Sequence, residues 1–190
     1  SISKAFMNFF LNPKLLNQIH IFVGGIVSVL AFYFLGQGEI VGWVFQSIAG
    51  ILYTFYYLRQ KLPILATVIL GAEAILPLYG IYKWSQSLNE FTFIDSFILG
   101  ITFIFVLYMA YKMFHKQKEK FFSILIEFVN SVLYIIAALL LATTQSVFAW
   151  IIFLIVFSIT LGLVAIKKEW IAVMFQLIYI SLAIFAISQT

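Results

Sequence analysis

The sequence predicts an all-α integral membrane protein in which residues 1–190 form a single transmembrane domain. Hydrophobic residues make up 64% of the chain and charged residues only 9%, whereas soluble globular proteins are roughly half apolar and a quarter charged. The mean hydropathy is +1.11, which is typical of proteins that lie within a bilayer. The apolar residues fall into seven long runs separated by short loops, and this pattern leaves no segment for a separate soluble domain.

Each run is long enough to form a transmembrane helix, which needs about 20 mainly apolar residues. The tight turns "GQGE" and "ATTQ" and the longer connections "SQSLNE" and "HKQKEK" separate four pairs of neighbouring runs. Residues 1–18 have mixed apolar and basic character, so we expect a short interfacial helix there that Pro13 breaks or bounds. The seven predicted transmembrane helices are residues 19–36, 40–58, 62–83, 93–114, 121–142, 146–166 and 169–188.

The basic residues predict the orientation of the chain in the membrane. With a cytoplasmic N-terminus, all of the 11 Lys and Arg residues except Lys83 lie in cytoplasmic segments, as the positive-inside rule requires. The odd number of spans then puts the C-terminus outside. The net charge of +4 is small and comes from short loops, so it does not indicate binding of nucleic acid.

A shift of 107 residues superposes the first three predicted spans on the last three without a gap. Trp43 then aligns with Trp150, Lys61 aligns with Lys168, and the turn "GQGE" aligns with "TTQS". Both triples begin on the same side of the membrane, because one span lies between them. We therefore predict 3+1+3 parallel triple-helix repeats, an arrangement typical of transporters with a site between the repeats; the alternative is seven helices packed without symmetry. The first bundle, the linker helix and the second bundle are residues 19–83, 93–114 and 121–188.

Two acidic residues, Glu73 and Glu127, lie at clear depth inside the predicted spans, and Asp95 lies near an outer end. An ionisable group in a span costs at least ~2.5–3.5 kcal/mol on insertion scales, so it faces the bundle interior or a water-filled path. Pro77 follows Glu73 by four residues and removes the helix hydrogen bond to the Glu73 carbonyl. We expect a local polar spot or a hinge at this point of the third span.

Amide, carboxyl and tyrosine side chains on several spans predict a polar site lined by aromatic rings. Rings hold flat faces and cations, while amides and carboxylates hold hydroxyls and amines. Such a site suits a flat, hydroxylated small molecule that is uncharged or cationic. The alternative for the amides is that they only hydrogen-bond neighbouring helices to one another. The alternative for the tyrosine-rich segment "LYTFYYL" (52–58) is that it faces lipid or the membrane interface and does not line the site. The predicted substrate-binding residues are Gln46, Tyr53, Glu73, Tyr79, Glu127, Asn130, Tyr134, Gln176 and Tyr179.

Other chemistries find little support in the sequence. The chain has no cysteine, so thiol catalysis and cysteine metal sites are excluded. Its two histidines, His20 and His115, lie near span ends and belong to no HExxH motif. We predict no metal, no cofactor and no enzymatic activity.

Several local motifs point to a known family. "SIAGILY" (47–53) precedes the basic turn "RQK", "FIDSF" (93–97) begins a helix that ends in "YKMFHKQK", and "YGIYKW" (79–84) is an aromatic span ending. With seven short spans in a 3+1+3 pattern, these motifs resemble the PnuC vitamin transporters and, more distantly, the SWEET sugar transporters. If Asn130 takes the place of the family's midspan asparagine, spans four to six match its last triple, so two repeat frames stay open. The sequence departs from the family's tryptophan pairs, because its four tryptophans are isolated.

The resemblance implies facilitated diffusion of a vitamin precursor, most commonly nicotinamide riboside, through a homotrimer in the bacterial inner membrane. Thiamine or riboflavin is the cargo of relatives, and a cytoplasmic kinase traps the product. Two alternatives from other classes remain. One is a non-transporting membrane subunit or scaffold of a larger complex. The other is a lipid-modifying enzyme that uses Glu73, Asp95 and Glu127 as acid and base.

Overall fold

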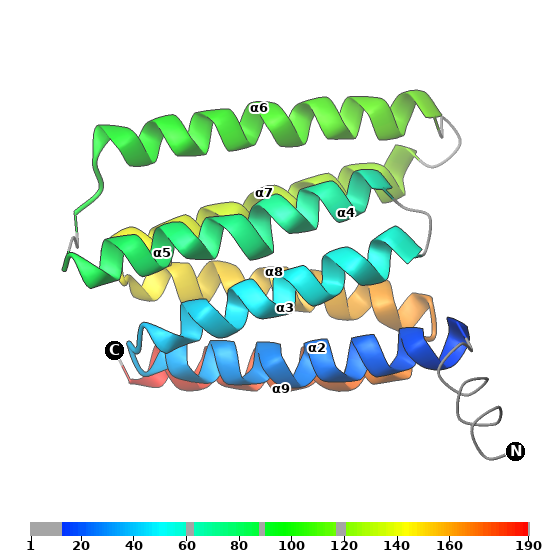
Figure 1. The fold of residues 1–190 in the computed structure, drawn as a ribbon, viewed down its shortest axis with the longest axis horizontal. Helices are drawn as coiled ribbons and strands as arrows, with labels where there is room; N and C mark the ends of the chain where they lie inside the picture. The colour runs from blue at the N-terminus through cyan, green and yellow to red at the C-terminus, as the bar shows by residue number, and fades with distance from the viewer. Residues whose placement is uncertain (1–12, 60–62, 88–89, 117–120, 190) are drawn as a thin grey trace, which may run out of the picture.

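The computed structural model describes residues 13–59, 63–87, 90–116 and 121–189, which form long helices lying side by side (Figure 1). The helical path of the third predicted span is divided into α4, a π-helical segment η1, and α5. In chain order the elements are α2 (Pro13–Gly36), α3 (Val41–Arg59), α4 (Pro63–Ile69), η1 (Leu70–Ile75), α5 (Leu76–Ser85), α6 (Phe93–Lys116), α7 (Phe121–Thr144), α8 (Val147–Ile166) and α9 (Trp170–Ser188).

Within the described residues, six helices are long and apolar enough to cross a membrane, namely α2, α3, α6, α7, α8 and α9. The prediction of an all-helical membrane protein is therefore confirmed. The third predicted span, 62–83, is not one regular α-helix. The backbone N–H of Leu76 bonds to the carbonyl of Gly71, five residues back, and Pro77 has no N–H to restore the α-helical pattern. The structure thus agrees with the expected interruption next to Glu73.

The start of the first helix differs from the prediction. Residues 13–18 were expected in a separate interfacial segment, but they form the first part of α2, which begins at Pro13. Proline is well tolerated in the first helical turn, because its missing N–H would have no partner there. The remaining part of that predicted segment, residues 1–12, lies outside the described residues, as do 60–62 and 117–120 of two predicted basic loops.

The helices pack in a regular pattern of neighbours. Helix α2 contacts α3 and α9, α8 contacts α7 and α9, and α5 contacts α7. Helix α6 lies along one edge of the bundle (Figure 1) and contacts α7 and α4. Its side chains are mostly exposed, and its buried residues are Asp95 and Val106. Helix α6 is therefore the least enclosed helix among those described.

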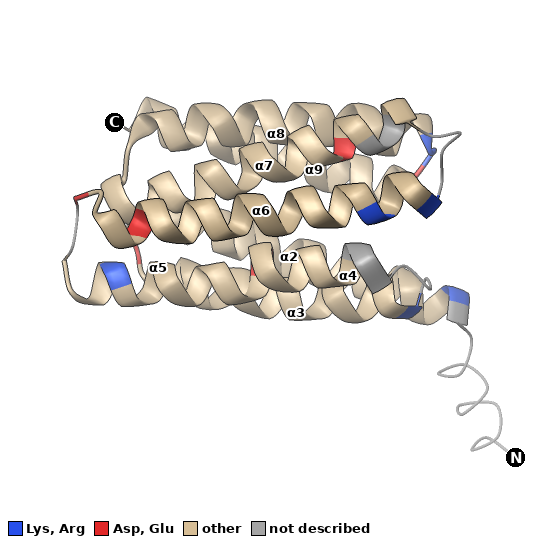
Figure 2. Cartoon of the chain, turned by 90° about the horizontal axis from the view of Figure 1, so that it is seen from above, with Lys and Arg blue, Asp and Glu red and all other residues tan. Residues whose placement is uncertain are grey.

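An aromatic core joins α2, α8 and α9. The ring of Phe32 meets those of Phe153, Phe157 and Tyr179 at centroid distances of 5.6, 4.9 and 5.3 Å. Such edge contacts add to the stabilisation from apolar burial. Charged residues, in contrast, gather at the two ends of the bundle, and most basic ones lie at the end where α2 begins (Figure 2). The interior is consequently apolar except at a few positions.

Candidate functional site

A group of polar side chains meets between α3, η1, α7 and α9, and we call Gln46, Tyr53, Glu73, Tyr134 and Tyr179 the central cluster. The Gln46 amide donates from Nε2 to the Tyr134 hydroxyl at 2.6 Å. Tyr53, Tyr134 and Tyr179 each interact electrostatically with Glu73. All five residues were predicted as site residues, and the structure brings them together.

Close backbone contact between α3 and η1 positions Glu73. The Ser47 hydroxyl donates to the Ala74 carbonyl at 2.7 Å. A Cβ atom added to Gly50 would lie 2.2 Å from the Glu73 carbonyl carbon and oxygen, so only glycine permits this approach. The polar spot expected beside Pro77 therefore lies against α3, and two small residues of α3, Ser47 and Gly50, hold it there.

Tyr179 forms the α9 side of the central cluster. Its side chain is 5% exposed, and its hydroxyl donates to the Gly25 carbonyl of α2 at 3.3 Å. The Tyr53 and Tyr179 hydroxyls also interact with each other. The Tyr53 ring packs on Gly24, where an added Cβ atom would lie 3.1 Å from it. Gly24 thus makes room for the Tyr53 ring of α3, and the space that Gly25 leaves is taken by the Phe175 ring of α9.

Four buried amide oxygens have no hydrogen-bond partner among the residues that the structure describes. They are Oδ1 of Asn17, Oε1 of Gln46, Oδ1 of Asn130 and Oε1 of Gln176. Such groups are uncommon in proteins and call for an explanation at each position. All four are acceptors, and so is the Glu73 carboxylate when it is ionised. This chemistry suits a ligand that carries hydroxyl or amide N–H donors.

Two predicted site residues, Glu127 and Asn130, make their contacts outside the central cluster. Oε1 of Glu127 lies 3.9 Å from Nζ of Lys167, and Asn130 donates from Nδ2 to the Thr160 hydroxyl at 2.9 Å. Asn130 therefore serves at least partly as a link between α7 and α8, which was the alternative weighed for the amides. Tyr57 of α3, by contrast, interacts electrostatically with Glu73 and with Glu127. Tyr57 belongs to the segment "LYTFYYL". The sequence pattern of that segment does not show which of its tyrosines face the site and which face lipid.

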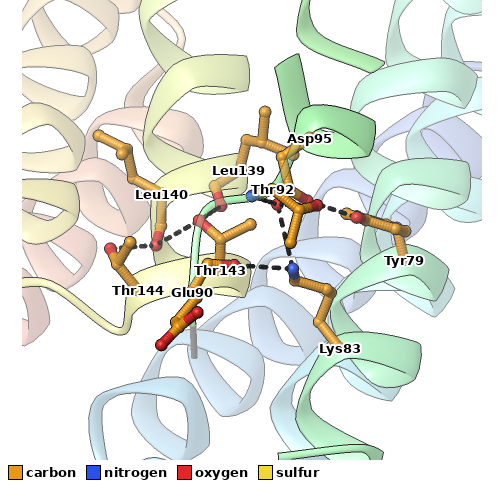
Figure 3. A network of polar contacts seen from close by, with 9 residues as sticks. All are labelled: Tyr79, Lys83, Glu90, Thr92, Asp95, Leu139, Leu140, Thr143 and Thr144. Carbon is orange, nitrogen blue, oxygen red and sulfur yellow. Dashed lines mark hydrogen bonds and ion pairs between the residues drawn. The ribbon is translucent and has the colours of Figure 1, made fainter. Parts of the chain in front are cut away.

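A second polar group, the outer cluster, lies where α5 is joined to α6 and consists of Tyr79, Lys83, Glu90, Thr92 and Asp95 (Figure 3). Nζ of Lys83 lies 3.0 Å from Oδ2 of Asp95 and donates to the Glu90 carbonyl at 3.0 Å. The Tyr79 hydroxyl donates to Oδ1 of Asp95. The side chains of Lys83 and Asp95 are 1% and 0% exposed, so this is a fully buried ion pair.

Asp95 also caps the start of α6. The Thr92 backbone N–H and hydroxyl donate to its Oδ2 at 2.5 and 2.8 Å, as in a capping box, where an acidic residue three positions into a helix bonds back to the residue before it. The prediction that Tyr79 is a ring contact of the substrate site is not supported by this geometry, because its hydroxyl is held at Asp95. The ion pair was also not predicted from the sequence, although Lys83 and Asp95 carry opposite charges on the two sides of the short connection between α5 and α6.

A groove of about 500 Å³ lies between α7 and α8, away from both clusters. It is lined entirely by apolar residues and glycine, as expected of a surface that faces lipid. Among the described residues, no group of three or more His, Cys, Asp or Glu side chains is placed to hold a metal ion. The lining residues of the groove are Leu125, Ile126, Val129, Ile159, Gly162, Leu163 and Ile166.

Among the described residues, six helices long and apolar enough to cross a membrane, with polar side chains between some of them, define a polytopic membrane protein. A family model described as "Nicotinamide mononucleotide transporter" matches residues 18–190. The chain therefore belongs to the nicotinamide mononucleotide transporter family, which confirms the PnuC-type resemblance, and it is a membrane transporter and not an enzyme. No curated protein and no solved structure gives a significant match.

Proposed function

We propose that the chain carries nicotinamide riboside across the membrane by facilitated diffusion and binds it at the central cluster. The observation that carries the proposal is the chemistry of this cluster, which combines acceptor oxygens with tyrosine rings. A riboside offers ribose hydroxyls and a carboxamide as donors, and its pyridinium ring is flat and cationic. Cations and flat rings bind well over tyrosine faces.

The same chemistry disfavours a nucleotide as the cargo. A phosphate monoester carries nearly two negative charges near pH 7 and is usually bound by Arg, Lys or helix N-termini. In the described part of the chain, no Lys or Arg side chain forms an ion pair with Glu73. A phosphate at this position would also meet the Glu73 carboxyl group.

The helix bounds support the proposed seven spans and the 107-residue repeat. Shifted by 107 residues, α2 covers 120–143, where α7 is Phe121–Thr144, and α3 covers 148–166, where α8 is Val147–Ile166. The segment 63–85 then begins at 170, where α9 begins. The same shift places α2 on α7 and α5 on α9. The contact between α2 and α9 therefore has its counterpart in the contact between α7 and α5. This agreement favours the 107-residue frame over the frame that places Asn130 in the family's ligand helix.

We further propose a homotrimer in the bacterial inner membrane with a cytoplasmic N-terminus and an external C-terminus. Lys83, the single exception to the charge rule, is neutralised in its buried ion pair with Asp95, so it adds no free positive charge to the outer side. Because the chain has no cysteine, single-cysteine variants at Gln37 and Gln189 can be labelled with an impermeant thiol reagent. Both are expected to react from outside in intact cells, and light scattering of the purified protein checks the trimer.

The test of function is uptake of labelled nicotinamide riboside by proteoliposomes. We expect saturable uptake that needs no ATP, no comparable uptake of nicotinamide mononucleotide, and a loss of at least tenfold in the Gln46→Ala variant. Equal uptake of riboside and nucleotide would contradict the assignment. Absence of uptake together with co-purification of a stoichiometric partner would point to the membrane-subunit alternative.

A further inference from the structure

The groove between α7 and α8 has the size of a ligand site. Its volume of about 500 Å³ lies within the range of about 300–1,000 Å³ found for small-molecule pockets. On α8 its wall is formed by Ile159, Gly162, Leu163 and Ile166, whose spacings of three and four residues place them in one stripe along the helix. The groove therefore follows the helix axis and reaches the end of α8 at Ile166.

Gly162 keeps this groove open. A Cβ atom added to Gly162 would meet nothing within 4 Å, so no neighbouring helix requires a glycine at this position. Glycine is also unfavourable in the interior of a helix compared with alanine or leucine. The missing side chain deepens the groove, and a large residue at position 162 would fill it.

Opposite charges lie at one end of the groove. Glu127 follows the lining residue Ile126 on α7, and Lys167 follows the lining residue Ile166 on α8. Oε1 of Glu127 and Nζ of Lys167 are 3.9 Å apart, and the two side chains are 29% and 56% exposed. Because this distance exceeds the length of a hydrogen bond, each charged group can still bond to a third partner.

This end of the groove lies at the boundary of the hydrocarbon core. Helix α8 has 20 residues and is therefore about 30 Å long, which matches the thickness of the core at about 30 Å. Lys167 is the first residue beyond it, and Trp170, which is 69% exposed, begins α9 three residues later. Tryptophan and lysine at helix ends are typical of the membrane interface. An acyl chain can thus lie in the groove while its headgroup meets Glu127 and Lys167.

The charges at this end favour a zwitterionic headgroup over an anionic one. Of the described residues that flank the end of the groove, Lys167 and Lys168 are basic, and Glu127 and Glu169 are acidic. Their charges balance, so they do not select a headgroup that is only negative. A headgroup with a phosphate and a primary ammonium offers an acceptor to Lys167 and N–H donors to Glu127.

We propose that the groove between α7 and α8 binds one phospholipid with a primary-amine headgroup, namely phosphatidylethanolamine. One acyl chain lies along the groove past Gly162, the phosphate meets Lys167, and the ammonium meets Glu127. The lipid bridges the two charged groups that the protein itself leaves 3.9 Å apart. The site is separate from the central cluster and does not depend on which substrate the chain carries.

The experiment is native mass spectrometry of the delipidated full chain, titrated with three lipids that share dioleoyl chains and differ only in the headgroup. They are phosphatidylethanolamine, phosphatidylcholine and phosphatidylglycerol. We expect one tightly bound phosphatidylethanolamine per protomer, with an affinity about fivefold or more above that of the other two, as one hydrogen bond provides. Phosphatidylcholine carries the same charges but has no N–H donor, so this comparison tests the bond to Glu127.

Three variants make the test specific to the groove. Gly162→Leu fills the groove and should weaken binding of all three lipids by about tenfold, because the acyl chain loses its apolar contacts. Glu127→Leu removes the acceptor and should abolish the preference for phosphatidylethanolamine over phosphatidylcholine. Lys167→Gln should weaken binding of all three lipids, because they share the phosphate.

Two controls match these variants. Gly100→Leu makes the same change at another open position, on α6, where an added Cβ atom also meets nothing within 4 Å. Lys112→Gln removes an exposed lysine of α6. Both should bind phosphatidylethanolamine as the unmodified chain does, and thermal unfolding confirms that every variant is folded.

Equal binding of phosphatidylethanolamine and phosphatidylcholine by the unmodified chain would overturn the proposal, and so would undiminished binding by Gly162→Leu. The same spectra give the number of chains in each particle. If Gly162→Leu changes that number and leaves the number of bound lipids unaltered, the groove is an interface between copies of the chain, and the proposal is wrong.

Discussion

The central and outer clusters are both polar groups in an apolar bundle, but they differ in how completely their members are paired. In the outer cluster, Asp95 accepts from Tyr79, Lys83 and Thr92, and its charge is balanced. In the central cluster, Glu73 forms no ion pair among the described residues, and Oε1 of Gln46 has no hydrogen-bond partner among them. Paired buried groups stabilise one arrangement, whereas unpaired groups keep binding capacity for something else.

The difference teaches where to look for function in a chain of this kind. Burial of charge alone does not identify a substrate site, because the most deeply buried charges here, Lys83 and Asp95, hold α6 to α5. A buried charge that lacks its counter-charge is the more informative feature. Variants that remove one partner of a buried pair should lower the stability of the fold. Variants in the central cluster should instead lower the affinity for the ligand.

The largest loss of stability is expected for Asp95→Ala. This variant leaves the Lys83 ammonium buried and unpaired, which typically costs about 3–5 kcal/mol. Denaturant unfolding of the purified protein measures the change. The double variant Lys83→Met with Asp95→Leu should recover most of the loss, because apolar residues of similar volume need no counter-charge. Equal losses in the single and double variants would show that the ion pair is not the cause.

A smaller loss is expected for Gly50→Ala. The added Cβ atom would lie 2.2 Å from the Glu73 carbonyl, so η1 must shift, and such overpacking costs roughly 1–3 kcal/mol. Because Glu73 moves with η1, affinity for the riboside should fall as well. Gly100→Ala is the matched control, since a Cβ atom there meets nothing within 4 Å. Comparable losses in the two variants would contradict the close contact.

Tyr134→Phe should reduce stability by about 1 kcal/mol, because the net value of one hydrogen bond is about that size. The variant removes the acceptor that lies 2.6 Å from Nε2 of Gln46, and it should weaken riboside binding more than it weakens the fold. Thermal unfolding and calorimetry on the same sample compare the two effects. The exposed Tyr33→Phe serves as the control, and a larger effect there would argue against the role of the Gln46–Tyr134 bond.

The smallest effect is expected for Glu127→Gln. Lys167 and Glu127 are 56% and 29% exposed and lie 3.9 Å apart, and ion pairs of this kind contribute about 0–1 kcal/mol. We expect a change in unfolding free energy below about 1 kcal/mol that vanishes at high salt. A loss as large as that of Asp95→Ala would mean that Glu127 is as tightly coupled as the outer cluster.

The sequence by itself determined where the helices lie along the chain. Spans predicted at 146–166 and 169–188 are observed as Val147–Ile166 and Trp170–Ser188. This succeeds because a bilayer sets the length of each apolar run, and turn residues such as Gln145 and Ser146 end it. Both signals are local. The interruption of the third span was also visible, because Pro77 lacks a donor whatever surrounds it.

Only the tertiary structure decided which polar groups meet. Tyr79 and Tyr134 carry the same hydroxyl on two helices of the same bundle, yet one bonds to Asp95 and the other to Gln46. Helix periodicity predicts which residues share a face, but it does not say which neighbour that face meets or at what depth. Those are set by how closely the helices approach, as at Gly50, where a missing side chain brings α3 against Glu73.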